Sequence, residues 1–181
     1  MNLGKMFFLC TLAALSAPCV RAADGPGAAC ALLTQAEIDA ATGFKTGPGN
    51  PTDQELPASA ADPGKHATMY TCIWSVPAVH GQIVVGMGPA PAGGDAKTLS
   101  RQNVGMDALR KQQYTEESKD YGDIACSGMS PPASAAQGLS MSYCGTIVSG
   151  KFVSVTSMGP SKRLPLDQVK ALLDKAIRRA R

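Results

Sequence analysis

The sequence contains few side chains of the types that catalyse reactions or bind metals. Its two histidines, His66 and His80, lie in segments where we expect loops, and neither has a partner histidine or carboxylate at metal-site spacing. The motifs Gly-x-Ser-x-Gly and Ser-x-x-Lys, which mark two classes of serine enzyme, are absent from the sequence. Asp120 and Asp123 are the best carboxylates for a hydrolase, but carboxylates on loops are usually solvated. We therefore expect no enzyme activity and no cofactor.

Thioether sulfur is a second group that could bind a metal, because it suits the soft ion copper(I). Six methionines follow residue 22, and they are scattered along the chain. Several fall at inward positions of the strands and helices that we predict, where methionine fills gaps in a core. We interpret them as core residues and expect no metal site. They are Met69, Met87, Met106, Met129, Met141 and Met158.

The first 22 residues have the pattern of a cleavable secretory signal peptide. Lys5 precedes an apolar run from Met6 to Ala17, and a small-x-small pattern ends at Ala22. Cleavage would fall between Ala22 and Ala23. The run is shorter than the roughly 20 apolar residues that span a bilayer. We therefore predict a signal peptide over 1–22, a single domain over 23–181, and a periplasmic or secreted protein.

Cys19 allows an alternative, in which it carries a lipid and anchors a lipoprotein to the membrane. Pro18 precedes it and fits the recognition pattern of lipid attachment poorly, so we favour the alanine site.

The charge of the remaining chain excludes some classes of partner. Two of the 17 basic residues, Lys5 and Arg21, leave with the signal peptide, so 15 remain against 14 acidic residues. A surface for nucleic acid or anionic lipid needs a concentrated positive field. We expect no nucleic-acid partner, no membrane span and a monomer.

Four cysteines remain after cleavage, and an even number in an exported chain predicts two disulfides. Three pairings are possible. We prefer Cys30 with Cys72, which ties an N-terminal helix to a strand, and Cys126 with Cys144, which closes a short loop. No two of them are spaced Cys-x-x-Cys, as in a thioredoxin-like site.

The spacing of apolar residues predicts three helices. The capping box Thr34-Gln35-Ala36-Glu37 begins the first helix, and Gly43 ends it. Residues 95–113 have helical character, and a continuous apolar stripe after Pro165 predicts the last helix.

Alternating apolar residues predict five strands, near 69–76, 82–88, 124–127, 139–143 and 153–155. The segments 45–67 and 89–94 are rich in Pro and Gly, so we expect surface loops there. The order α-β-β-α-β-β-β-α predicts an α+β domain, with an antiparallel sheet of about five strands covered by helices. Trp74 and Tyr143 are expected in its core.

Two motifs resemble a known family. Cys30-Ala31-Leu32-Leu33-Thr34 and Cys72-Ile73-Trp74 are similar to those of small exported bacterial proteins of unknown function, which have a Cys-x-Leu-Leu-Thr helix and a Cys-x-Trp strand. The resemblance implies a PsbP-like sandwich, a fold used mainly for binding, and supplies no catalytic residues.

Together these features predict a non-catalytic exported binding or accessory protein. Its loops at 45–67 and 89–94 would contact a small ligand or another protein of the cell envelope, because a disulfide-bonded core can position such loops rigidly. The alternative is a periplasmic inhibitor or immunity protein that blocks a toxin or lysozyme-type enzyme.

Overall fold

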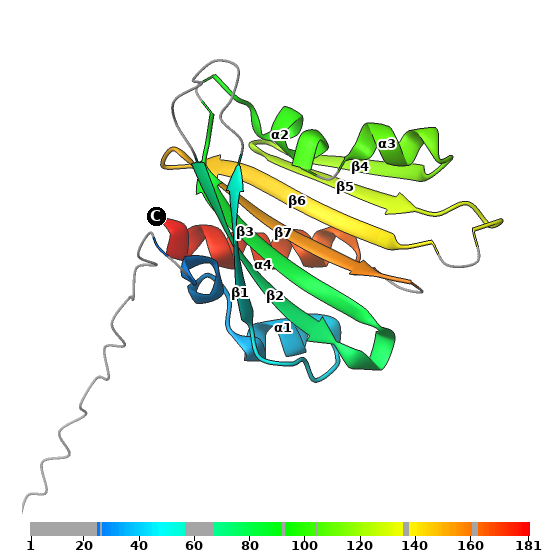
Figure 1. Ribbon diagram of the computed structural model, residues 1–181, viewed down its shortest axis with the longest axis horizontal. Coiled ribbons are helices and arrows are strands. Elements are labelled where there is room, and N and C mark those ends of the chain that lie inside the picture. The colour runs from blue at the N-terminus through cyan, green and yellow to red at the C-terminus, as the bar shows by residue number, and fades with distance from the viewer. Residues whose placement is uncertain are drawn as a thin grey trace, which may run out of the picture.

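The computed structural model is mostly β, and it consists of one antiparallel sheet of seven strands with helices on both faces (Figure 1). The strands are arranged in the order β1-β2-β3-β7-β6-β5-β4. The structure describes residues 25, 27–56, 67–91, 93–103, 105–135, 138–160 and 163–181. The signal peptide, its cleavage site at Ala22 and Ala23, and Cys19 lie outside these residues.

The elements in chain order are η1 (Ala28–Ala31), α1 (Gln35–Thr42), β1 (Asn50–Leu56), β2 (Ala67–Val76), η2 (Pro77–Val79), β3 (Gly81–Pro89), α2 (Ala96–Asn103), α3 (Met106–Lys111), β4 (Thr115–Tyr121), β5 (Ile124–Ser130), β6 (Ser140–Val148), β7 (Lys151–Gly159) and α4 (Leu166–Ala180).

The predicted fold class is therefore wrong. The expected five-stranded α+β sheet, with the order α-β-β-α-β-β-β-α and a PsbP-like sandwich, is replaced by a seven-stranded sheet with few helices. The two unexpected strands are β1, inside the expected loop at 45–67, and β4, inside a polar stretch. Both are edge strands, which are often polar because their outer side faces water. The expected helix at 95–113 is two helices, because Gly105 adopts a left-handed φ of 62° between them.

The main core lies between one face of the sheet and the elements η1, α1 and α4. Cys72, Trp74 and Val76 alternate along β2 towards this face, and all three are buried. The stripe of α4 packs on β5, β6 and β7. Its buried members are Leu166, Val169, Leu172, Leu173, Ala176 and Ala180.

Both disulfides are present, in the preferred pairing. Cys30 of η1 is joined to Cys72 of β2, with 5.0 Å between their Cα atoms. Cys126 and Cys144 are directly opposite each other on β5 and β6. Trp74 lies beside the first disulfide, because a Cβ on Gly49 would be 2.8 Å from both the Cys72 sulfur and the indole.

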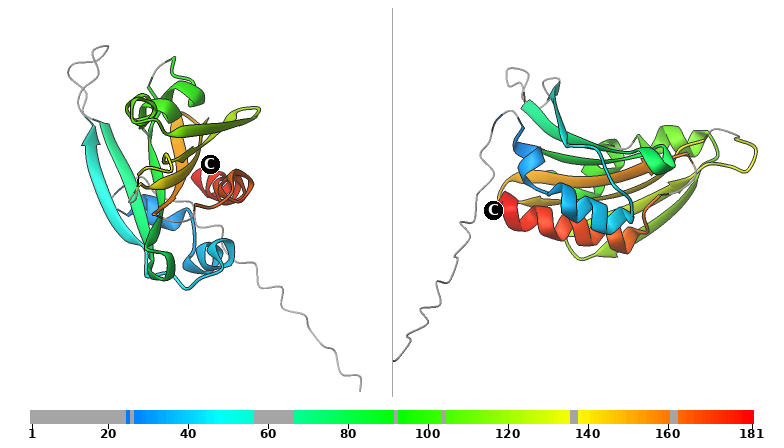
Figure 2. Two further views of the ribbon diagram at one scale, coloured as in Figure 1. Left: turned by 90° about the vertical axis from the view of Figure 1, so that its right-hand side faces the viewer. Right: turned by 90° about the horizontal axis from the view of Figure 1, so that it is seen from below.

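On the opposite face of the sheet, α2 packs over β5 and β6, and α3 follows it (Figure 2). Tyr143 and Phe152 are buried on this face, so Trp74 and Tyr143 lie in different layers. Gly145 allows α2 to approach closely, because a Cβ there would be 3.0 Å from the Ser100 hydroxyl. Among the described residues, no helix has both the length and the apolar composition needed to cross a membrane.

Candidate functional site

A cleft of about 390 Å³ opens at one end of the sheet, on the side of the main core. Three segments that are far apart in the sequence form its walls: the end of α1, the β2–β3 hairpin, and the connection from β7 to α4. Its apolar lining includes Phe44, Val76, Val79, Ile83 and Leu164.

The first wall is the end of α1 and the turn that follows it. Gly43 ends the helix with a left-handed φ of 73°. The Asp39 carboxylate then accepts hydrogen bonds from the Thr46 backbone NH (2.8 Å) and hydroxyl (2.7 Å), and these bonds lower the pKa of Asp39. They fix the turn that carries Phe44. Phe44 is 37% exposed, and among the described residues Phe44 and Leu139 are the two exposed large apolar residues.

The second wall is the hairpin formed by β2, η2 and β3. Val76 and Ile83 are buried beneath it, and Val79 is half-buried near its tip. The hairpin lies close to β7 at Gly81, where a Cβ would be 2.9 Å from the Met158 carbonyl oxygen. A larger residue at Gly81 would therefore separate the hairpin from β7 at the cleft.

The third wall is the connection that leads into α4. The Ser142 hydroxyl donates to the Leu164 carbonyl oxygen, and the Leu164 NH donates to the Ser157 hydroxyl (3.1 Å). Arg163 donates to Ser142 (2.8 Å) and to the Glu117 carboxylate (2.9 Å). These bonds attach the connection to β4, β6 and β7, so the wall is held in place by the sheet.

The chemistry of the lining is that of a binding site for an uncharged or weakly polar group. Gln168 and Ser157 add neutral donors and acceptors to the apolar walls. Among the described lining residues, Arg163 is the one with a formal charge, and it is paired with Glu117. Small-molecule sites are concave, mostly apolar, and contain a few polar groups that orient the ligand.

The comparisons with known proteins show a similar fold. The chain resembles the crystal structure of the extracellular domain of PknH from Mycobacterium tuberculosis, with a TM-score of 0.56 and 12% sequence identity. The match covers 86% of this chain and 96% of that domain. No family model and no curated protein sequence matches the chain. At this identity the likeness concerns the fold alone.

Asp120 and Asp123, the carboxylates considered for a hydrolase, line a second hollow of about 350 Å³ together with Asp95 and Lys97. Asp120 pairs with Lys97 at 3.2 Å, and both side chains are more than half exposed. Asp95 caps α2 by accepting bonds from the NH and hydroxyl of Thr98, which lower the pKa of Asp95. Two of these carboxylates thus have structural partners.

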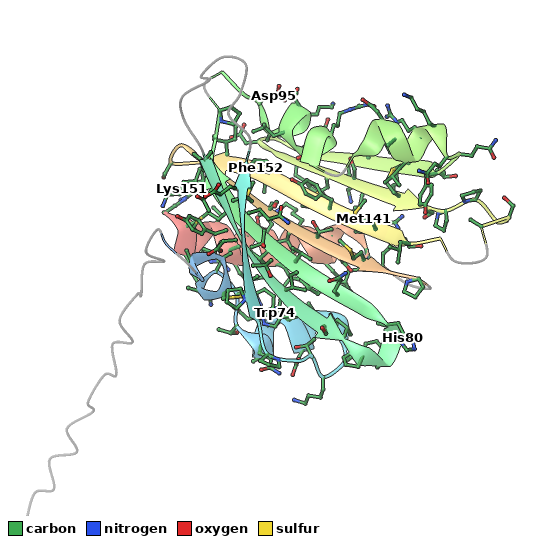
Figure 3. The ribbon with its side chains drawn as sticks, in the orientation of Figure 1. Trp74, His80, Asp95, Met141, Lys151 and Phe152 are labelled. Carbon is green, nitrogen blue, oxygen red and sulfur yellow. A yellow bond between two sulfur atoms is a disulfide. The ribbon has the colours of Figure 1, made fainter. Side chains whose placement is uncertain are left out.

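The remaining predicted residues do not meet at one place. His80 occupies the hairpin turn with a left-handed φ of 48°, while His66 and residues 57–66 of the expected contact loop lie outside the described residues. The segment near 89–94 follows the far end of β3, about 30 Å from the cleft at the usual rise per residue. Figure 3 shows His80 and Asp95 at opposite ends of the sheet.

Sequence reasoning missed Phe44, Val79 and Gln82 as cleft residues. The sequence does contain one feature that singles out Phe44. Phe44 and Phe152 are the two phenylalanines beyond the signal peptide, and Phe44 directly follows a helix-ending glycine. Among the described residues, no cluster of three or more His, Cys, Asp or Glu side chains could hold a metal.

Proposed function

We propose that the protein is an exported, non-catalytic binding domain whose cleft takes a small, mostly apolar molecule. One observation carries this proposal: an apolar cleft with neutral hydrogen-bonding groups, and the exposed ring of Phe44 in its lining. Contiguous apolar surface often marks a site of interaction, and Phe44 lines the cleft together with Val79 and Leu164. The volume of about 390 Å³ lies within the range of small-ligand pockets.

Export is supported by the two disulfides, since these bonds persist in oxidising compartments. The similar structure is itself described as an extracellular domain. A periplasmic or secreted location and a monomeric state belong to the same proposal. The alternative role as an inhibitor or immunity protein stays a prediction, because much of the loop on which it depends lies outside the described residues.

A fluorescence assay tests the cleft. The probe is 8-anilinonaphthalene-1-sulfonate, which becomes fluorescent in apolar sites. It is excited by energy transfer from Trp74, the single tryptophan. Trp74 is directly opposite Ile83, a cleft residue, so a probe in the cleft lies close to its donor. We expect one saturable site.

The matched variants are Phe44→Ser and Leu139→Ser. Phe44 lines the cleft, whereas Leu139, the other exposed large apolar residue in the part of the chain that the structure describes, is not part of its lining. We expect Phe44→Ser to weaken probe binding about tenfold, since losing an aromatic contact costs on the order of 1–2 kcal/mol. Leu139→Ser should leave binding unchanged. Equal effects of the two substitutions, with both proteins folded by circular dichroism, would contradict the proposal.

A further inference from the structure

Three methionines that are scattered in the sequence form one row across three neighbouring strands. Met129 of β5 is directly opposite Met141 of β6, and Met141 is directly opposite Met158 of β7. Directly opposite residues project from the same face of a sheet, with Cβ atoms about 5 Å apart. The three side chains are therefore neighbours, with Met141 in the middle. Figure 3 shows Met141 on β6.

The row differs from a core methionine in its access to solvent. Met87 lies in the main core, on the other face of the sheet, and is 1% exposed. Met129 is equally buried, but Met141 and Met158 are both half-buried. The Met158 sulfur also accepts a hydrogen bond from the Gln82 side-chain amide at 3.4 Å, so a polar group already reaches it. Two of the three methionines are thus partly accessible to solvent.

We propose that this row is a binding site for a soft monovalent cation of the copper(I) type. Thioether sulfur selects soft ions, and three neighbouring neutral sulfurs can hold a monocation without an added charge. Methionine is unbranched with three rotatable bonds, so the flanking side chains can turn their sulfurs towards Met141. This site adjoins the cleft, because Met158 and Gln82 also line it. The proposal does not rest on the cleft function, since the side chains of the row project from the opposite face of the sheet.

The test uses silver(I) as the probe and the exported protein labelled with [methyl-13C]methionine. On titration with silver(I), the methyl signals of Met129, Met141 and Met158 should shift together and saturate at one equivalent. The signal of Met69 should stay in place. Met69 is a matched control, because it lies on the same face near the far end, where its sulfur is 3.1 Å from the Cβ position of Gly88.

Substitution and pH sharpen the test. Met141→Leu and Met158→Leu should each weaken silver(I) binding at least tenfold, whereas Met69→Leu should not change it; these swaps conserve volume and keep the fold. Binding should be equal at pH 5.5 and 7.5, because thioethers do not titrate, whereas histidine must lose a proton to bind a metal. Unmoved signals of the row, equal loss in all three variants, or binding that fails at pH 5.5 would each overturn the proposal.

Discussion

The carboxylate of Glu37 joins α1 to α4, and its removal gives a quantitative test of the packing around the main core. Glu37 accepts two hydrogen bonds from the Arg179 guanidinium, at 2.8 and 3.0 Å, while also completing the capping box with Thr34. These contacts, chiefly the bond from Arg179, lower the pKa of Glu37 from 4.5 to about 2. At about 1.4 kcal/mol for each pH unit, the upper limit of the stabilisation is about 3 kcal/mol.

We expect Glu37→Gln to lower the free energy of unfolding at pH 7 by about 1–2 kcal/mol, because the carboxylate is one-fifth exposed and solvent screens the pair. Glutamine also serves in a capping box, so the change isolates the ion pair. The folded-state pKa is the lower one, so this stability is complete above pH 4.5 and is lost as the pH falls towards 2. By pH 3 the difference between the two proteins should shrink to about two-fifths of its value at pH 7.

The assay is urea unfolding between pH 7 and pH 3, followed by the fluorescence of Trp74. Glu55→Gln, at an exposed position of β1, is the control and should change the free energy of unfolding by less than about 0.5 kcal/mol. A Glu37→Gln effect that is as large at pH 3 as at pH 7 would refute the reasoning, because it could not come from the charge of the carboxylate.

Replacing Cys30 and Cys72 with alanine opens a link between residues 42 positions apart, and should cost about 4 kcal/mol in urea unfolding. A loss below about 1 kcal/mol would contradict this. Gly49→Ala places a Cβ 2.8 Å from the disulfide and the indole, so we expect a loss of about 1–3 kcal/mol and a red shift of tryptophan emission. An unchanged emission spectrum would contradict the close approach of Gly49 to the indole. Asp120→Asn breaks an exposed ion pair and should change the free energy of unfolding by less than about 1 kcal/mol. A larger loss of stability would contradict the interpretation of this ion pair as a weak surface contact.

Local sequence patterns predicted the elements whose signals are local. The capping box from Thr34 to Glu37 forms as expected, and Gly43 ends α1. The helix after Pro165 and the strands β6 and β7 also overlap the positions that apolar spacing predicted. In each case one stretch of chain contains both the periodicity and the residues that begin or end the element.

The missed strands have no such signal. The sequence of β4 is Thr-Glu-Glu-Ser-Lys-Asp-Tyr, and β1 contains Pro51 and three charged or amide side chains in a row. Strands at a sheet edge need no apolar alternation, and proline is tolerated there because one side of the strand is unpaired. Counting strands by alternation therefore gave five instead of seven.

The cleft could not be predicted because its walls meet only through the fold. Phe44, Val79 and Leu164 come from three distant segments, and their positions depend on Asp39, on Gly81 and on the bonds to the β7–α4 connection. The methionine row could not be predicted for the same reason, because it also forms only in the folded chain. Residues 129, 141 and 158 have no common spacing, and strand register alone brings them together.

Native mass spectrometry of the exported protein, purified from its host under mild conditions, tests the binding function most directly. The account predicts a chain with two intact disulfides and a small non-covalent adduct, present in the wild type and in Leu139→Ser but reduced in Phe44→Ser. A wild-type protein that has no adduct, or an adduct that Phe44→Ser retains in full, would contradict the assignment of the cleft as the binding site.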